Sequence, residues 1–113
     1  MTDAVAPRWE AKRTADSRAV EAVLRGDGFD RADAYRYNSA SIRVRVVDPR
    51  FETMPMDQRD ALVDRSLSKL PEEIQADIIT LFTFAPSELV QTPKTFRQFL
   101  QNVEFDDPSP SIL

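Results

Sequence analysis

Five side chains on two expected neighbouring strands could recognise a phosphate or a base: Tyr35, Arg36, Tyr37, Arg43 and Arg45. We call this set the arginine strip. In the second strand the arginines alternate with Ile42, Val44 and Val46, and because strand side chains alternate between faces, the two arginines share a face. Arginine beside aromatic rings binds phosphates and stacks on bases. A solvated strand face whose charges discourage aggregation explains the same pattern and is favoured over a nucleic-acid site.

Three aspartates at helical spacing are the candidate metal ligands. Asp57, Asp60 and Asp64 recur at i, i+3 and i+7, so they share one helix face, and carboxylates of this kind bind Mg²⁺ or Ca²⁺. The same spacing is typical of an exposed helix face, on which Asp60 and Asp64 repel each other by roughly a few tenths of a kcal/mol. The exposed face is the favoured interpretation, and we expect no metal and no cofactor.

Several chemistries are excluded by residue types that the chain lacks. Its 113 residues include no cysteine and no histidine, which removes disulfides, thiolate ligands, a cysteine nucleophile and an imidazole base. Gly26 and Gly28 are the only glycines, so a glycine-rich phosphate loop of the common types cannot form. Because no nucleophile–base pair or metal cluster remains, we expect that the protein is not an enzyme.

Length and charge indicate a single soluble domain. The chain is 42% hydrophobic and 30% charged, and a chain of this length can bury a core without disulfides. Residues 1–50 hold 10 Lys and Arg against 8 Asp and Glu, whereas residues 51–113 hold 5 against 11. The acidic second half disfavours non-specific nucleic-acid binding. With no apolar run long enough to span a bilayer and no signal-peptide core after Met1, we expect a cytoplasmic protein.

The elements that must position these residues are organised around residues 34–51. The β-branched run over residues 41–48 contains no Gly or Pro and is the clearest strand in the chain. A short strand over residues 33–37 precedes it across a hairpin loop, and a third strand over residues 78–85 is apolar on both faces. These patterns predict a three-stranded sheet.

Apolar spacing predicts four helices, over residues 14–25, 53–67, 71–76 and 93–102. Thr14 or Asp16, Thr53 and Thr92 are the expected caps of the first, second and fourth. The second helix should cover the sheet with a stripe made of Leu62, Val63 and Leu67. The fourth helix carries Phe96, Phe99 and Leu100 on one face.

The predicted architecture is one α+β domain over residues 14–102, with a mixed sheet covered on one face by helices in the order αββααβα. Residues 1–13 are expected to form a flexible arm, in which Trp9 packs loosely on the domain instead of anchoring a partner. Residues 103–113 are expected to form an irregular tail. The end of that tail, Ser111-Ile112-Leu113, could bind a sheet edge of another protein, but an unstructured or self-docked end is favoured.

Short motifs in matching order carry a resemblance to a known family: Gly28-Phe29, Ile42-Arg43-Val44-Arg45-Val46-Val47, Phe51-Glu52, Gln58-Arg59, Leu62-Val63 and Ala85-Pro86-Ser87-Glu88. Over roughly residues 15–90 the chain resembles the BolA-like family, whose fold is a type II KH-like α+β fold. The helix over residues 93–102 is then an addition to that fold. The resemblance implies a regulatory domain that acts through protein contacts, with a monothiol glutaredoxin as the implied partner.

The resemblance also implies an iron–sulfur site from which this sequence departs. Members of the family hold the cluster with a histidine at the head of the last strand, where this chain has Asp77, and their Arg-His pair is Arg59-Asp60 here. Because a carboxylate is a poor substitute for imidazole or thiolate in such clusters, we do not expect cluster binding.

The favoured function is therefore a non-enzymatic protein-interaction or regulatory domain of BolA-like type. Its candidate partner surface is Arg59, Asp60, Asp77, Ile78 and Ile79. The alternative is a KH-like nucleic-acid-binding domain that uses the arginine strip, although the sequence has no Gly-x-x-Gly clamp.

Overall fold

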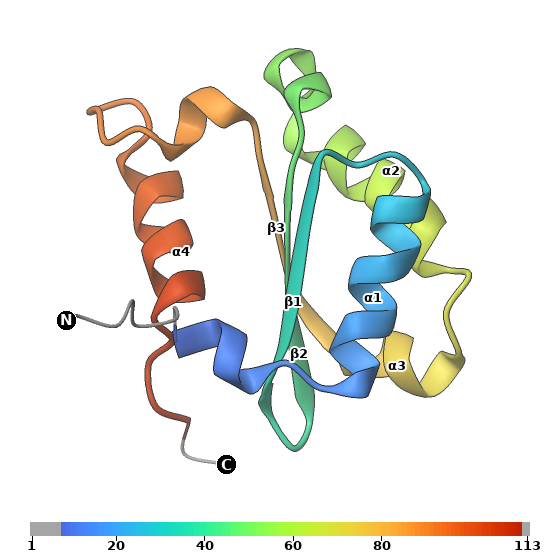
Figure 1. Ribbon diagram of the computed structural model, residues 1–113. Helices are drawn as coiled ribbons and strands as arrows, with labels where there is room; N and C mark the ends of the chain where they lie inside the picture. Colours follow the sequence, from blue (N-terminus) through green and yellow to red (C-terminus); the bar gives the residue numbers. More distant parts are fainter. Residues whose placement is uncertain (1–7, 112–113) are drawn as a thin grey trace, which may run out of the picture.

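A mixed sheet of three strands forms the centre of residues 8–111, the part of the chain that the computed structural model describes (Figure 1). β1 (Arg31–Asn38) pairs antiparallel with β2 (Ser41–Val47), and β2 pairs in parallel with β3 (Ile78–Phe84). The register sets Val44 opposite Ala34 on one side and opposite Leu81 on the other. The predicted three-stranded sheet is confirmed, with β2 as its central strand.

Three helices cover one face of this sheet: α1 (Ala15–Gly26), α2 (Met56–Leu67) and α3 (Glu72–Asp77). The side chains of Ile42, Val44 and Val46 are fully buried against them and share a core with Val63 and Leu67. Removing these apolar side chains from water is the main force that holds the strand and the helices together. The predicted contact between the central strand and the second helix is therefore confirmed.

The opposite face of the sheet is covered as well, which is more than the sequence predicts. α4 (Phe96–Asp106) and the 3-10 helix η1 (Arg8–Lys12) pack on it, across the sheet from α1 in Figure 1. Trp9, Tyr35 and Phe105 form a second, smaller core there, and the ring centroids of Tyr35 and Phe105 are 4.7 Å apart. This face carries aromatic side chains between its charged ones, and burying the large apolar area of these rings stabilises the packing of α4 and η1 on it.

Both ends of the described chain are more ordered than the sequence predicts. Trp9, expected in a flexible arm, lies in η1 and is only 5% exposed, whereas residues 1–7 lie outside the described part of the chain. α4 continues to Asp106, so the irregular tail begins at residue 107 instead of 103. Asn38 donates a hydrogen bond to the Ser111 hydroxyl at 3.1 Å, which attaches the tail to the β1–β2 hairpin. Ile112 and Leu113, the last residues of the segment that could bind a sheet edge of another protein, lie outside the described residues.

Local signals set several of the helix ends. Thr14 caps α1 as predicted, because its hydroxyl accepts the Ser17 N–H at 3.2 Å and the Ser17 hydroxyl accepts the Thr14 N–H at 2.8 Å. Gly28 follows α1 with φ of 92°, in the left-handed region that glycine adopts without a steric cost. Thr53 does not cap α2, because it ends the 3-10 helix η2 (Pro49–Thr53). No helix within residues 8–111 has the length and hydrophobicity needed to cross a bilayer.

Candidate functional site

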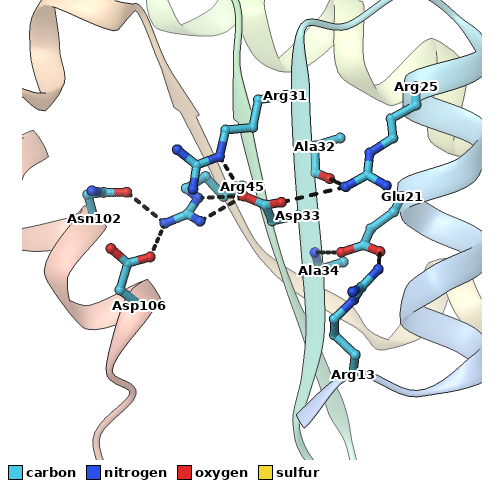
Figure 2. Close-up of polar contacts among 10 residues, drawn as sticks. All are labelled: Arg13, Glu21, Arg25, Arg31, Ala32, Asp33, Ala34, Arg45, Asn102 and Asp106. Carbon is cyan, nitrogen blue, oxygen red and sulfur yellow. Dashed lines mark hydrogen bonds and ion pairs between the residues drawn. The ribbon is translucent and has the colours of Figure 1, made fainter. Parts of the chain in front are cut away.

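The centre of the arginine strip is buried instead of open to solvent. Arg45 is 0% exposed, and its guanidinium lies 4.2 Å from the centroid of the Phe105 ring. It donates to Asp33 Oδ2 from Nη2 at 2.7 Å and from Nε at 3.2 Å, and to Asn102 Oδ1 at 2.8 Å. It also forms an ion pair with Asp106, so the network in Figure 2 joins β1, β2 and α4. The expectation of an accessible cation at this position is wrong, because α4 covers it.

Arg43, two residues before Arg45 on β2, is also paired with a carboxylate of α4. Its Nη1 donates to Glu104 Oε2 of α4 at 2.8 Å and to the Tyr35 hydroxyl at 3.1 Å. Its guanidinium carbon lies 3.6 Å from the centroid of the Tyr37 ring. Burial raises the pKa of Glu104, but hydrogen bonds from Ser109 and Arg43 outweigh it and lower the pKa overall. Arg43 and Arg45 therefore hold α4 on the sheet.

The third arginine of the strip, Arg36, binds Asp77, the position at which members of the BolA-like family that the sequence resembles have a histidine. Arg36 Nη2 lies 2.9 Å from an oxygen of Asp77 and 3.3 Å from an oxygen of Asp16. Asp77 is the last residue of α3, directly before β3. A carboxylate held by a guanidinium, in a chain without cysteine or histidine, does not fit an iron–sulfur cluster. Asp77 and Arg36 instead form an ion pair between α3 and β1.

Side chains occupy the outer edge of β1. Glu21 of α1 is 2% exposed, accepts the Ala34 N–H at 3.0 Å and forms an ion pair with Arg13. Arg25 of the same helix donates to the Ala32 carbonyl at 3.0 Å. Figure 2 shows these side chains along β1, between the strand and α1. Because they use backbone groups that an added strand would need and stand in its place, another strand cannot pair with β1.

The outer edge of β3, the other end strand of the sheet, borders a groove instead. The groove has a volume of about 380 Å³ and lies between α2 and α4. Its lining includes Met56 and Asp60 of α2, Leu81 and Phe82 of β3, and Arg97 and Gln101 of α4. At the start of the same strand, the Ile79 side chain is 68% exposed. Arg59 of α2 donates to the Thr83 carbonyl on this edge at 3.3 Å, and the part of the edge before Thr83 is the accessible one.

The walls of the groove carry opposite charges and one unpaired acceptor. Asp60 lies on the α2 side and Arg97 on the α4 side. Burial, followed by repulsion from the Asp64 carboxylate, raises the pKa of Asp60. Gln98 Oε1 is buried in the α4 wall and has no hydrogen-bond partner among the described residues. A buried acceptor without a partner costs free energy, which an incoming N–H group would recover.

The residues of the expected partner surface fall into different places. Arg59 is 6% exposed and donates to Glu88 of η3 (Pro86–Leu89) at 2.7 Å and to the Thr83 carbonyl at 3.3 Å, so it fixes the end of β3. Ile78 packs against the main core. Asp60 lines the groove and Ile79 is exposed, so these two remain available to a partner.

The three aspartates of α2 are not gathered into a metal site. Asp57 and Asp64 are exposed, and only Asp60 lines the groove. Among residues 8–111, no group of three or more acidic, histidine or cysteine side chains is close enough to hold a metal ion. Asp57 and Asp64 lie on a solvated part of the helix, as the spacing favours, whereas Asp60 lies at the groove.

The α4 residues that line the groove are not among the site residues that the sequence predicts. Gln98 and Gln101 form its α4 wall together with Arg97, and they lie on the sheet side of the helix that also carries the buried Phe105. The spacing of these positions, with Phe105 four residues after Gln101, is a helical pattern that indicates a second packed face. The sequence prediction for this helix includes only the face with Phe96, Phe99 and Leu100, so it does not cover these positions.

Comparison with known proteins supports the fold. No family model matches the chain, and no curated protein matches it. Among solved structures, the chain is similar to the solution structure of BolA1 protein from Mus musculus, with a TM-score of 0.55 and 23% identity, over 100% of this chain and 85% of that chain. This likeness shows a BolA-like fold, as the short motifs predict. It extends over α4, which the resemblance over residues 15–90 does not reach.

Proposed function

We propose that this domain of BolA-like fold is a non-enzymatic protein-interaction domain that binds an extended segment of a partner protein along the outer edge of β3. The observation that carries the proposal is the difference between the two end strands. Side chains of α1 occupy the edge of β1, whereas the edge of β3 borders a groove of about 380 Å³. Extended segments add to open sheet edges through main-chain hydrogen bonds, and the neighbouring side chains select their sequence.

The lining of the groove indicates the chemistry of the segment. Leu81 and Phe82 offer apolar surface, which favours an apolar side chain at the centre of the segment. Asp60 attracts a basic side chain toward α2, and Arg97 attracts an acidic one toward α4. A segment of mixed charge with a central apolar residue therefore fits best.

No observation favours nucleic-acid binding as a second function. Each arginine of the strip already has a carboxylate partner, at 2.9 Å for Arg36, 2.8 Å for Arg43 and 2.7 Å for Arg45. Phosphate contacts supply most of the affinity of non-specific nucleic-acid binding, and they need free cations. The candidate strip has none to offer without breaking the contacts of Arg43 and Arg45 with α4 or the ion pair of Arg36 with Asp77.

The proposal is tested by affinity purification with quantitative mass spectrometry from cells that express the protein naturally. Tagged wild type is compared with Asp60→Lys and Ile79→Lys, which change the groove and the open edge. Asp57→Lys is the matched control, because it makes the same change on an exposed part of α2 outside the groove. We expect a partner that wild type and Asp57→Lys retain and that both other variants lose.

The binding is then measured by calorimetry with the purified partner. We expect Asp60→Lys to weaken binding at least about tenfold, which corresponds to about 1.4 kcal/mol. Circular dichroism checks that each variant is folded. A partner retained equally by all variants, or no partner above background with wild type, would contradict the proposal.

A further inference from the structure

The outward face of α4 is apolar, although the helix already packs on the sheet with its other face. Phe96, Leu100 and Val103 are 49%, 48% and 45% exposed, and they recur at i, i+4 and i+7. Residues at this spacing lie in one row along a helix. They are half of the six large apolar side chains that are exposed within residues 8–111. A contiguous exposed apolar row of this kind marks an interaction surface.

The charges at the ends of α4 are the reverse of those that favour an isolated helix. Lys94 and Arg97 lie at its start, while Glu104, Asp106 and Asp107 lie at its end. The start of a helix carries partial positive charge and its end partial negative charge, so each of these side chains is unfavourable for its own helix. A neighbouring helix that runs the other way reverses this effect, because it places each end beside charges of opposite sign.

The apolar row and the charges are arranged about one point. Lys94 and Asp107 lie at equal distances in sequence from the bond between Leu100 and Gln101, and so do Arg97 and Glu104. The apolar row is centred on Leu100. A two-fold axis at this point places the middle of the row of one copy against the middle of the same row in a second copy. It also places the basic end of each helix beside the acidic end of the other.

We propose that the outer face of α4 binds a second copy of this chain, as an antiparallel pair of α4 helices related by a two-fold axis. The outer charges are free to take part, since Lys94 is exposed and the Asp107 side chain is 60% exposed in a surface pair with Arg8. Glu104 contacts Arg43 and is still 33% exposed. Apart from Arg97, which also lines the β3 groove, this interface is separate from that groove, and it does not depend on the function proposed for it.

The interface is small, which sets the strength to expect. Three half-exposed apolar side chains from each copy place it at the low end of specific interfaces, so we expect a dissociation constant of roughly 10–100 µM. The weight-average mass in sedimentation velocity should rise from the monomer toward twice that mass as the concentration of the full chain increases from low micromolar to near millimolar.

Two substitutions to glutamate locate the interface. Leu100→Glu places like charges beside each other at the two-fold axis, so it should keep the chain monomeric across the whole series. Met56→Glu is the matched control, because Met56 is also 48% exposed but lies on α2 at the β3 groove. We expect Met56→Glu to leave the self-association unchanged. Loss of the dimer with Met56→Glu instead of Leu100→Glu, or a wild type that stays monomeric throughout, overturns the proposal.

A charge exchange tests the antiparallel orientation. Lys94→Glu and Asp107→Lys each bring like charges together at the ends of the pair, and each should weaken self-association several-fold at low salt. The double variant restores opposite charges and should recover the wild-type dissociation constant. Thermal unfolding at low concentration verifies that all variants fold. Single variants that weaken the dimer without recovery in the double variant contradict an antiparallel pair.

Discussion

At the scale of single residues, Arg45 shows what alternation can and cannot predict. The run Ile42 to Val47 places this arginine on the face opposite the main core, and the structure confirms that placement. Its burial depends on Asn102 and Asp106, which are 57 and 61 residues further along the chain. No local pattern connects these positions. A strand with alternating arginines therefore shows the same sequence pattern whether that face is exposed to solvent or covered by a helix.

The buried network of Arg45 gives a prediction for stability. Arg45→Ala removes the buried cation shared by Asp33 and Asp106, but Asp33 keeps Arg31 at 2.9 Å and the Asp106 side chain is 44% exposed, so we expect the free energy of unfolding to fall by about 1.5–3 kcal/mol. Arg45→Lys should also destabilise the fold, because an ammonium group cannot make the paired contact with Asp33 or stack on Phe105. Urea unfolding followed by circular dichroism measures both.

Arg8→Ala is the control for this measurement. It removes a surface ion pair whose side chains are 66% and 60% exposed, and such pairs contribute about 0–1 kcal/mol. If Arg45→Ala costs no more than Arg8→Ala, the network around Arg45 does not stabilise the fold.

At the scale of elements, the strands and the helices of the main core could be predicted, whereas the cover of the second face could not. The apolar stripes of α1 and α2 repeat over several turns, which is the strongest signal that a sequence provides. η1 has only five residues, too few to show a period, and it is ordered by the contact of Trp9 with Tyr35 and Phe105. α4 starts later than expected because the Thr92 N–H donates to Thr95 Oγ1 at 3.0 Å, which makes a turn where a helix start was predicted.

The contribution of η1 can be measured through Trp9, the only tryptophan in the chain. Trp9→Ala removes a buried ring from the second core, so we expect a loss of about 3–5 kcal/mol in the free energy of unfolding. In the wild type the tryptophan fluorescence should resist quenching by acrylamide until the fold opens. Phe96→Ala, which truncates a ring that is 49% exposed, should cost far less in the monomer. Free quenching of Trp9 in the native protein would contradict its buried position.

At the scale of the whole molecule, the motifs predict the fold but not the role. The BolA-like architecture follows from the order of the elements, and similarity to the mouse BolA1 structure supports it. In the BolA-like family that the sequence resembles, a histidine at the head of the last strand holds the cluster, and this chain has Asp77 there, so the absence of cluster binding is a prediction that rests on the resemblance. The interaction partner and the cytoplasmic location therefore stay predictions.

The absence of cluster ligands has a direct spectroscopic consequence. Protein incubated without oxygen in the presence of ferrous iron and sulfide, then desalted, should show no visible absorbance from an iron–sulfur cluster, because the chain has no thiolate or imidazole to hold one. Asp77→Asn removes the remaining charged ligand at the family position and should give the same spectrum. A stoichiometric chromophore in the wild type that Asp77→Asn abolishes would show that Asp77 acts as a ligand.

The side chains of Glu21 and Arg25 also decide how copies of this protein can aggregate. A fibril of stacked sheets grows only if every subunit offers two borders, one that receives the previous subunit and one that receives the next. Here the Ala34 N–H and the Ala32 carbonyl at the edge of β1 are already hydrogen-bonded to side chains of α1. Two molecules that paired through their β3 edges would therefore leave no free edge to which a third molecule could add. Polymerisation would first require α1 to detach, and the stability of that helix therefore limits how readily this protein forms fibrils.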